Sequence, residues 1–333
     1  MSPATRRPLA HTLGAAVIAL ACYAALVMVG VVVALVLLQR GVTPDLPWLR
    51  PVQRRAYARL TRATWQRVAD CVEFDSVLIY RPRVGTCHFA NLEYRTSLTF
   101  SAHGRDTGRR PAGRGIAVLG DSHAMGWGVQ DLETFAAELQ RRTGRPVYNL
   151  GVSSYATERE LERWRLTGLA DSVDTVVLQY SENDLPENRH GRLGTAESNR
   201  RKFDYNLVGR AQPLRVTAEI LRVWLYAFGR PFTAPLRGLL HRGGDDFTPH
   251  LAPLVDVLER YPELRDERVI VTYLNSRGRR YRNFPAGRLP ALPHVEFLEL
   301  APVPGGYYVL DDHMNPVGHA AVAAQLAAAV APR

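Results

Sequence analysis

One serine in this chain stands where a nucleophile would be expected. Ser122 comes directly after an apolar run of strand length that closes with Gly120 and Asp121. Such a run is typical of a buried strand in a parallel sheet, and ligands bind at the carboxyl ends of parallel strands. A serine hydroxyl is a weak nucleophile at neutral pH, so it needs a base within hydrogen-bond reach and a third group that orients the base.

Partners for that serine occur near the end of the chain. Asp311, Asp312 and His313 precede an Ala-rich helix expected from about residue 317 to residue 330. His313 would take the proton of Ser122, and a carboxylate would hold the imidazole and stabilise its charged form. Asp311 is favoured over Asp312, because in extended backbone positions two apart point the same way and neighbours point apart.

Acyl transfer also requires hydrogen-bond donors aimed at the developing oxyanion. The expected strand 147–150 leads into Gly151, whose backbone N–H could approach a ligand closely. The expected strand 175–180 leads to Asn183, whose side-chain amide would reach the same edge of the sheet. Each residue alone has an ordinary structural explanation, as a turn glycine or an amide bonded to its own loop.

These blocks, in this order, resemble the SGNH hydrolases, the superfamily of GDSL esterases and lipases. The resemblance covers the chain from about residue 115 to the C-terminus. It implies Ser122 as nucleophile, His313 as base, and an oxyanion hole formed by Ser122, Gly151 and Asn183. The resemblance also implies an α/β fold in three layers, α/β/α, around a parallel sheet.

Two positions depart from the superfamily pattern. Leu310 stands three residues before His313, where the superfamily usually has Asp, so this chain uses the shorter Asp-x-His spacing. That spacing is similar to the one in membrane-associated members, including proteins of the alginate acetyltransferase type. Ser181 stands where the third block usually begins with Gly.

The alternation of strands and helices after residue 113 favours a parallel sheet with helices on both faces. Residues 188–205 are polar and rich in Arg, which predicts a long loop. Residues 216–228 predict a helix for which three placements stay open: packed on the core, over an acyl pocket as a lid, or against a bilayer. The expected division is a tail (1–12), a transmembrane anchor (13–38), a stalk with a strand-rich segment (39–112) and the catalytic domain (113–333).

Residues 13–38 are apolar and carry no charge. At about 1.5 Å per residue, such a helix can cross a hydrocarbon core about 30 Å thick. The run ends at Gln39 and Arg40 without a small-residue cleavage site, which favours an uncleaved signal anchor in the cytoplasmic membrane over a cleaved signal peptide. A buried core helix is the alternative.

Two observations on orientation disagree. More Arg residues follow the expected anchor than precede it, and the positive-inside rule then favours a cytoplasmic domain. Cys71 and Cys87, the only cysteine pair outside the anchor, flank a segment expected to be strand, turn and strand. A disulfide there would persist in an oxidising compartment, so we expect an extracytoplasmic domain. Two unrelated thiols are the alternative.

Neither the net charge nor the positions of the histidines indicate a nucleic-acid or metal site. The net charge is +10, but Lys202 is the single lysine among 42 basic residues and the Arg residues are spread along the chain, so we expect no nucleic-acid partner. The Cys and His residues show no metal-ligand spacing, and we expect neither metal nor cofactor. His123 is expected to line the pocket, His319 to be structural at the surface, and His294 to be structural.

The expected function is a membrane-anchored serine esterase that cleaves acyl esters, acetyl esters first among them, on an envelope or exported glycan. The glycan is inferred from the expected location alone. Three alternatives remain: a polysaccharide O-acyltransferase with the same triad, a noncatalytic glycan-binding protein that retains the fold, and a cytoplasmic enzyme with a lipid or thioester substrate.

Overall fold

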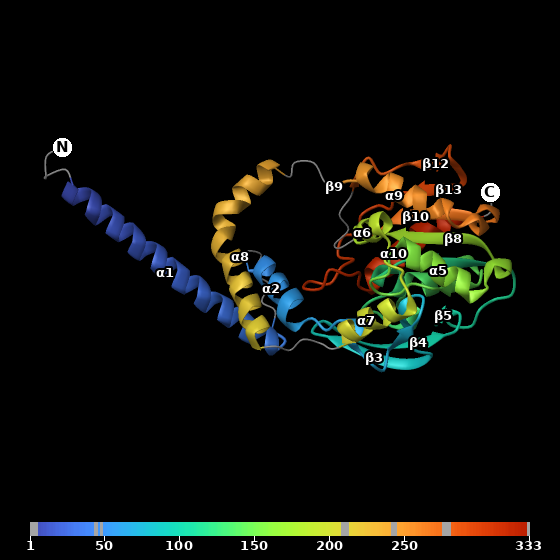
Figure 1. Cartoon of the computed structure of the whole chain (residues 1–333), viewed down its shortest axis with the longest axis horizontal. Coiled ribbons are helices and arrows are strands. Elements are labelled where there is room, and N and C mark those ends of the chain that lie inside the picture. The colour runs from blue at the N-terminus through green and yellow to red at the C-terminus, as the bar shows by residue number, and fades with distance from the viewer. Residues whose placement is uncertain are drawn as a thin grey trace. The chain divides into compact units, whose positions relative to one another are not determined.

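The computed structural model describes residues 6–42, 46, 49–207, 213–240, 245–274 and 281–331. These described residues divide into two compact units, one lying within the ranges 1–62 and 210–242 and the other within the ranges 63–209 and 243–333. The candidate catalytic residues all belong to the second unit. Figure 1 shows the elements of both units along the chain.

A nine-stranded sheet forms the second unit, in the order β12-β13-β10-β8-β6-β7-β5-β4-β3. Its central strands β13, β10, β8, β6 and β7 are parallel to one another, whereas β12 pairs antiparallel at one side and β5, β4 and β3 at the other. The sheet is therefore mixed and mostly parallel. Its strands are β3 (Gly85–Asn91), β4 (Tyr94–Ser101), β5 (Gly104–Arg105), β6 (Gly115–Leu119), β7 (Val147–Asn149), β8 (Val173–Tyr180), β10 (Arg268–Tyr273), β12 (Gly287–Leu289) and β13 (Leu292–Leu298).

Side-chain alternation along β6 explains why helices cover both faces of this sheet. Ala117 and Leu119 belong to an apolar cluster with α5 (Thr157–Thr167) and α9 (Thr248–Glu259). Ile116 and Val118 point the other way, into a cluster with α4 (Phe135–Thr143) and α10 (Pro316–Val330). Successive strand residues face opposite sides, so a strand buried on both faces is apolar throughout. The predicted helix–strand alternation after residue 113 is present.

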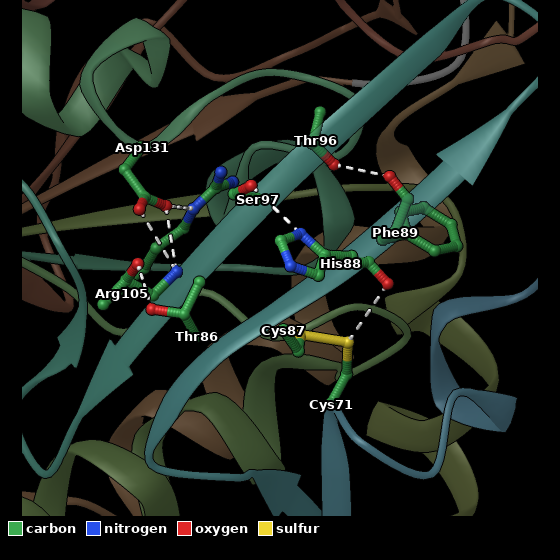
Figure 2. Close-up of a disulfide and its surroundings, with 10 residues drawn as sticks. Cys71, Thr86, Cys87, His88, Phe89, Thr96, Ser97, Arg105 and Asp131 are labelled. Atoms are coloured by element: carbon green, nitrogen blue, oxygen red, sulfur yellow. Dashed lines mark hydrogen bonds and ion pairs between the residues drawn. A yellow bond between two sulfur atoms is a disulfide. The ribbon is translucent and has the colours of Figure 1, made fainter.

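The strand-rich segment contributes the edge of the same sheet. Two strands, β1 (Val72–Asp75) and β2 (Ile79–Pro82), form a separate antiparallel hairpin, and β3 to β5 extend the sheet beyond β7. A disulfide joins Cys71, directly before β1, to Cys87 on β3, as the sequence predicted. Figure 2 shows this bond beside the paired strands β3 and β4. The sheet thus draws on residues on both sides of position 112.

The prediction of a long loop over residues 188–205 was wrong. Helix α6 (Asp184–His190) occupies its start and α7 (Ala196–Leu207) its end. Ion pairs one turn apart line α7, Arg201 with Glu197 and Arg200 with Asp204. Such pairs support a polar helix that shows few apolar residues. A single buried aromatic side chain, Phe203, connects α7 to an apolar cluster that contains residues of β1, β2, β3 and β4.

The first unit contains α1 (Arg6–Gln39), α2 (Arg50–Ala56), a π-helical turn (Tyr57–Thr61) and α8 (Pro213–Leu240). Within α1, residues 11–39 contain an 18-residue window with a mean hydropathy of 2.8 and could cross a membrane by length and composition alone, a test that a signal sequence also passes. The expected stalk is partly helical, since it includes α2.

Helix α8 packs on α1 in this first unit. The Trp224 indole N–H donates to Ala24 O at 3.1 Å, and Tyr23 Oη donates to Phe228 O at 3.1 Å. None of the described α8 residues belongs to the three apolar clusters of the second unit. Within the first unit α8 therefore packs on α1, and the placement of residues 216–228 on the core, as a lid or against a bilayer stays a prediction.

Candidate active site

The turn after β6 presents Ser122 at the carboxyl edge of the sheet. A Cβ atom on Gly120 would lie 2.5 Å from Gln179 Oε1 and 2.7 Å from Ala124 Cβ, so only glycine fits there. Asp121 then caps the short helix α3 (Ser122–Met125) by accepting a hydrogen bond from the backbone N–H of His123 at 2.8 Å. A tight glycine turn and an Asp cap thus fix the backbone that carries the serine.

Three of the predicted residues form one hydrogen-bonded chain. The Ser122 Oγ atom lies 2.7 Å from His313 Nε2, and His313 Nδ1 lies 2.6 Å from Asp311 Oδ1. Since the carboxylate accepts from Nδ1, the free lone pair is on Nε2, where it can accept the serine proton. Asp312 Oδ1 is farther from His313 Nδ1, at 3.4 Å, so the geometry favours Asp311 as the partner.

Asp311 is fully buried and receives further donors that sequence reasoning missed. The Tyr94 hydroxyl donates to Asp311 Oδ2 at 3.1 Å, and the Trp127 indole N–H donates to the same oxygen at 3.3 Å. Trp127 is five positions after Ser122, close enough in sequence to have been considered. Tyr94 lies 217 positions before Asp311, and no local pattern links the two.

The imidazole of His313 lies between two flat rings. Trp127 stacks on it with ring centroids 4.7 Å apart and an interplanar angle of 15°, and His123 lies 4.9 Å away on a tilted plane. Burial lowers the pKa of His123 to about 4, so this neighbour is neutral near pH 7. A neutral ring adds no charge repulsion when His313 becomes protonated, and the Trp face attracts a cation.

The predicted oxyanion donors follow neighbouring strands. Ser122 follows β6, Gly151 follows β7 and Asn183 follows β8, in the order β8-β6-β7. The sequence runs from β6 to β7 on one side and then to β8 on the other, which makes this edge a topological switch point. Crevices at such points are where ligands bind in parallel sheets.

The amide of Gly151 is already used within the protein. Its N–H donates to Asn149 Oδ1 at 3.1 Å. A Cβ atom at Gly151 would lie 2.3 Å from Met125 N, so glycine is required here for close packing beneath the turn that carries Ser122. A role for Gly151 as an oxyanion donor would require a bifurcated hydrogen bond.

Ser181 connects the Asp121 turn to Asn183. Its hydroxyl donates to Asp121 Oδ2 at 2.9 Å and contacts Asn183 Oδ1 very closely. The Asn183 amide nitrogen donates to Tyr155 O at 3.3 Å, and this nitrogen carries a second proton for another acceptor. The Ser181 hydroxyl therefore lies between Asp121 and Asn183, and its one proton can be donated to only one of them at a time.

His319 is not at the surface, and that prediction was wrong. It is 1 % exposed, and its Nδ1 accepts a hydrogen bond from the Phe135 backbone N–H at 3.1 Å. It fills the contact between the start of α10 and the start of α4, where its ring stacks on Phe135. Burial lowers its pKa well below the usual value. His294 lies half-buried within β13, and burial lowers its pKa as well.

Among the described residues, Asp311, Asp312 and His313 form the one group whose ligand atoms lie close enough, within 4.8 Å, to hold a metal ion. The same atoms already form the bond between His313 Nδ1 and Asp311 Oδ1. A metal ion on Nδ1 would replace that bond and its proton. The donor set therefore fits a catalytic triad better than a metal site.

No protein-family model matches the sequence, and a comparison with curated proteins finds no match. Among solved structures, the chain is similar to a G-D-S-L family protein from Desulfitobacterium hafniense, described as lipolytic, with 10 % identity over 65 % of this chain and 98 % of that one, and a TM-score of 0.34. An acetyl xylan esterase from Butyrivibrio proteoclasticus gives 10 % identity, 67 % and 65 % coverage and a TM-score of 0.33. At these TM-scores the similarities carry no argument, so the function has to rest on the geometry of the site itself.

Proposed function

We propose that this protein is a serine esterase of the SGNH type that acts through a covalent acyl–Ser122 intermediate. The single observation that carries the proposal is the chain of hydrogen bonds from Ser122 Oγ through His313 to buried Asp311. A hydroxyl, an imidazole and a carboxylate in this order form the nucleophile, base and orienting group that acyl transfer requires.

In the acylation step, Ser122 Oγ attacks the acyl carbonyl carbon while His313 Nε2 takes the hydroxyl proton. The carbonyl electrons move to oxygen, and the backbone N–H of Ser122 and the Asn183 amide supply donors at the resulting oxyanion. Collapse of the tetrahedral species breaks the ester C–O bond. The protonated His313 then gives its proton to the leaving alcohol oxygen, with Asp311 stabilising the imidazolium until that transfer.

Deacylation repeats these steps with a new acceptor. His313 removes a proton from a water molecule, which attacks the acyl–serine carbonyl carbon. The bond between that carbon and Ser122 Oγ then breaks, the acid leaves, and His313 returns the proton to Ser122 Oγ. If a sugar hydroxyl takes the place of water, the same site performs O-acyl transfer. The Asp-x-His spacing, which resembles that of membrane-associated members, favours including acyl transfer as the second candidate function.

The proposal places the catalytic domain outside the cytoplasmic membrane. Support comes from the apolar span in α1 and from the Cys71–Cys87 disulfide, since such bonds persist in oxidising compartments. In that location the natural substrate class is an acylated envelope or exported glycan, with acetyl as the acyl group.

The test is ester hydrolysis by the full-length protein in detergent. We expect release of p-nitrophenol from p-nitrophenyl acetate, and covalent labelling by a fluorophosphonate. Ser122→Ala should abolish labelling and lower kcat by about four to six orders of magnitude. The matched control is Ser76→Ala in the turn between β1 and β2, which should leave both unchanged.

Adding an acceptor sugar separates the two reactions. Acyl transfer predicts that an oligosaccharide speeds nitrophenol release and becomes acylated, whereas hydrolysis predicts free acetate alone. Folded wild-type protein that neither turns over nor labels would contradict the proposal and favour the noncatalytic glycan-binding alternative.

A further inference from the structure

The hairpin of β3 and β4 reaches the candidate active site from a distant part of the sequence. Its tip, between Asn91 and Tyr94, is held in place by side-chain bonds. Asn91 Oδ1 accepts from the Ala63 backbone N–H at 2.7 Å, and Asn91 Nδ2 donates to the Tyr94 hydroxyl at 2.7 Å. Farther along β3, the Cys87 disulfide to Cys71 ties the hairpin to the chain before β1 (Figure 2).

Glu93, at the tip of this hairpin, binds the loop that carries Asp311. Its carboxylate accepts hydrogen bonds from three consecutive backbone N–H groups, those of Val309 at 2.7 Å, Leu310 at 2.9 Å and Asp311 at 2.7 Å. Consecutive N–H groups that converge on one anion form a compact, strongly directional contact. The carboxylate therefore fixes the backbone of the triad loop at the residue that supplies the triad carboxylate.

The same hairpin contacts the triad by two further routes. The residue after Glu93 is Tyr94, whose hydroxyl donates to Asp311 Oδ2 at 3.1 Å. Phe89 on β3 packs edge-on against Trp127 with centroids 4.7 Å apart, and Trp127 in turn stacks on His313. Residues of the hairpin therefore contact the backbone of residues 309–311, the carboxylate of Asp311 and, through Trp127, the imidazole of His313.

We propose that Glu93 is a positioning residue for catalysis, which acts by holding the backbone of residues 309–311 so that Asp311 Oδ1 faces His313 Nδ1. This inference rests on the proposed esterase function. The hydrogen bonds of Glu93 go to the backbone of residues 309–311, so we expect its effect to pass through the loop that carries Asp311. A shift of about 1 Å in a catalytic group can cost about a hundredfold in rate, so three hydrogen bonds at this point matter.

The decisive variant is Glu93→Gln in the full-length protein. Glutamine keeps the size but replaces one acceptor oxygen with an NH₂ group that faces N–H donors. We expect kcat to fall about tenfold to a hundredfold with KM within about twofold. Fluorophosphonate labelling of Ser122 should slow by a similar factor. Glu73→Gln on β1, which removes a partly exposed carboxylate paired with Arg81, is the matched control and should change neither rate.

Two measurements distinguish positioning from a general loss of stability. In an Asp311→Asn background, Glu93→Gln should lower kcat by less than about twofold further, because the group through which it acts is already disabled. Hydrogen exchange at the amides of residues 309–311 should accelerate in Glu93→Gln while exchange in β6 and β8 stays unchanged. If the variant fails to fold, Glu93→Asp, which keeps the charge but shortens the side chain that reaches the N–H groups of residues 309–311, replaces it in the same double-mutant cycle.

Unchanged kcat in a folded Glu93→Gln protein would overturn the inference, as would a full effect that persists in the Asp311→Asn background. Failure of the proposed function is a different result. In that case wild-type protein itself shows no turnover and no labelling of Ser122.

Discussion

At the scale of single residues, two adjacent carboxylates have different expected roles. Asp311 is fully buried and bonded to the imidazole, to Tyr94 and to Trp127, whereas Asp312 is about one-third exposed. A carboxylate that fixes the tautomer of the base contributes far more to the rate than one nearby in solvent.

Exchange of each carboxylate for its amide tests this difference. Asp311→Asn should lower kcat by about four orders of magnitude, because the amide can hold the imidazole in the wrong tautomer. Asp312→Asn should stay within about threefold, since an exposed charge is screened by solvent. Steady-state hydrolysis of p-nitrophenyl acetate measures both. Equal losses in the two variants would contradict the assignment of Asp311 as the orienting group.

At the scale of elements, local patterns in the sequence predicted the central strands correctly. The apolar runs that became β6 and β8 are strands in the structure because they are buried on both faces. Local patterns failed where a distant contact decides the outcome. The polar helix α7 is attached by two buried side chains, Phe203 in an apolar cluster and Asn199, whose amide donates to Ser76 O at 2.9 Å. Buried His319 depends on the meeting of α10 with α4.

The residues of the candidate site also fall into two groups, those with a local sequence signal and those defined by a contact with a distant part of the chain. Ser122 and His313 were predicted as site residues from the residues around them, as the strand lead-in and the Asp-x-His spacing are local, and the structure brings their side chains within hydrogen-bond distance. Glu93 and Tyr94 were missed, because they reach Asp311 through the pairing of β3 with β4 at the edge of the sheet. Nothing in the sequence near either residue indicates which loop it will contact.

Helix α5 contains a buried carboxyl group with an expected effect on stability. Glu160 is 1 % exposed, and neither of its carboxyl oxygens has a hydrogen-bond partner among the described residues. Burial raises its pKa well above the usual value, and the nearby carboxylates of Asp184 and Asp121 add to the rise. The neutral form is therefore the one that the folded protein favours.

The sign of the pH effect is set by this shift. A pKa raised by folding gives a contribution to stability that is complete below the unfolded-state pKa and is lost as pH rises toward the folded-state pKa. Within that window, each pH unit costs up to about 1.4 kcal/mol. Glu160→Gln removes this loss, so its melting temperature relative to wild type should be higher at pH 8 than at pH 5.

Thermal unfolding of the full-length protein at both pH values provides the measurement. Glu162→Gln is the matched control on the same helix, since Glu162 is paired with Arg165 rather than left without a partner. A difference between Glu160→Gln and wild type that is the same at both pH values would show that the carboxyl group is not held neutral by the fold.

At the scale of the whole molecule, charge and cysteine chemistry predict opposite orientations. The Arg residues after α1 favour a cytoplasmic second unit, whereas the disulfide between Cys71 and Cys87 favours an oxidising compartment. The rule on flanking charges applies mainly to short loops, since large domains can cross largely regardless of charge. We therefore give the disulfide more weight.

Counting thiols decides between the two orientations. The protein has three cysteines, of which Cys22 in α1 is free. Protein taken from cells by acid quenching, then unfolded without reductant, should bind one maleimide group per chain if the second unit is extracytoplasmic. Reductant should raise the number to three, and Cys22→Ser should lower the unreduced number to zero. Three groups without reductant would show reduced Cys71 and Cys87, and would favour a cytoplasmic enzyme with a lipid or thioester substrate.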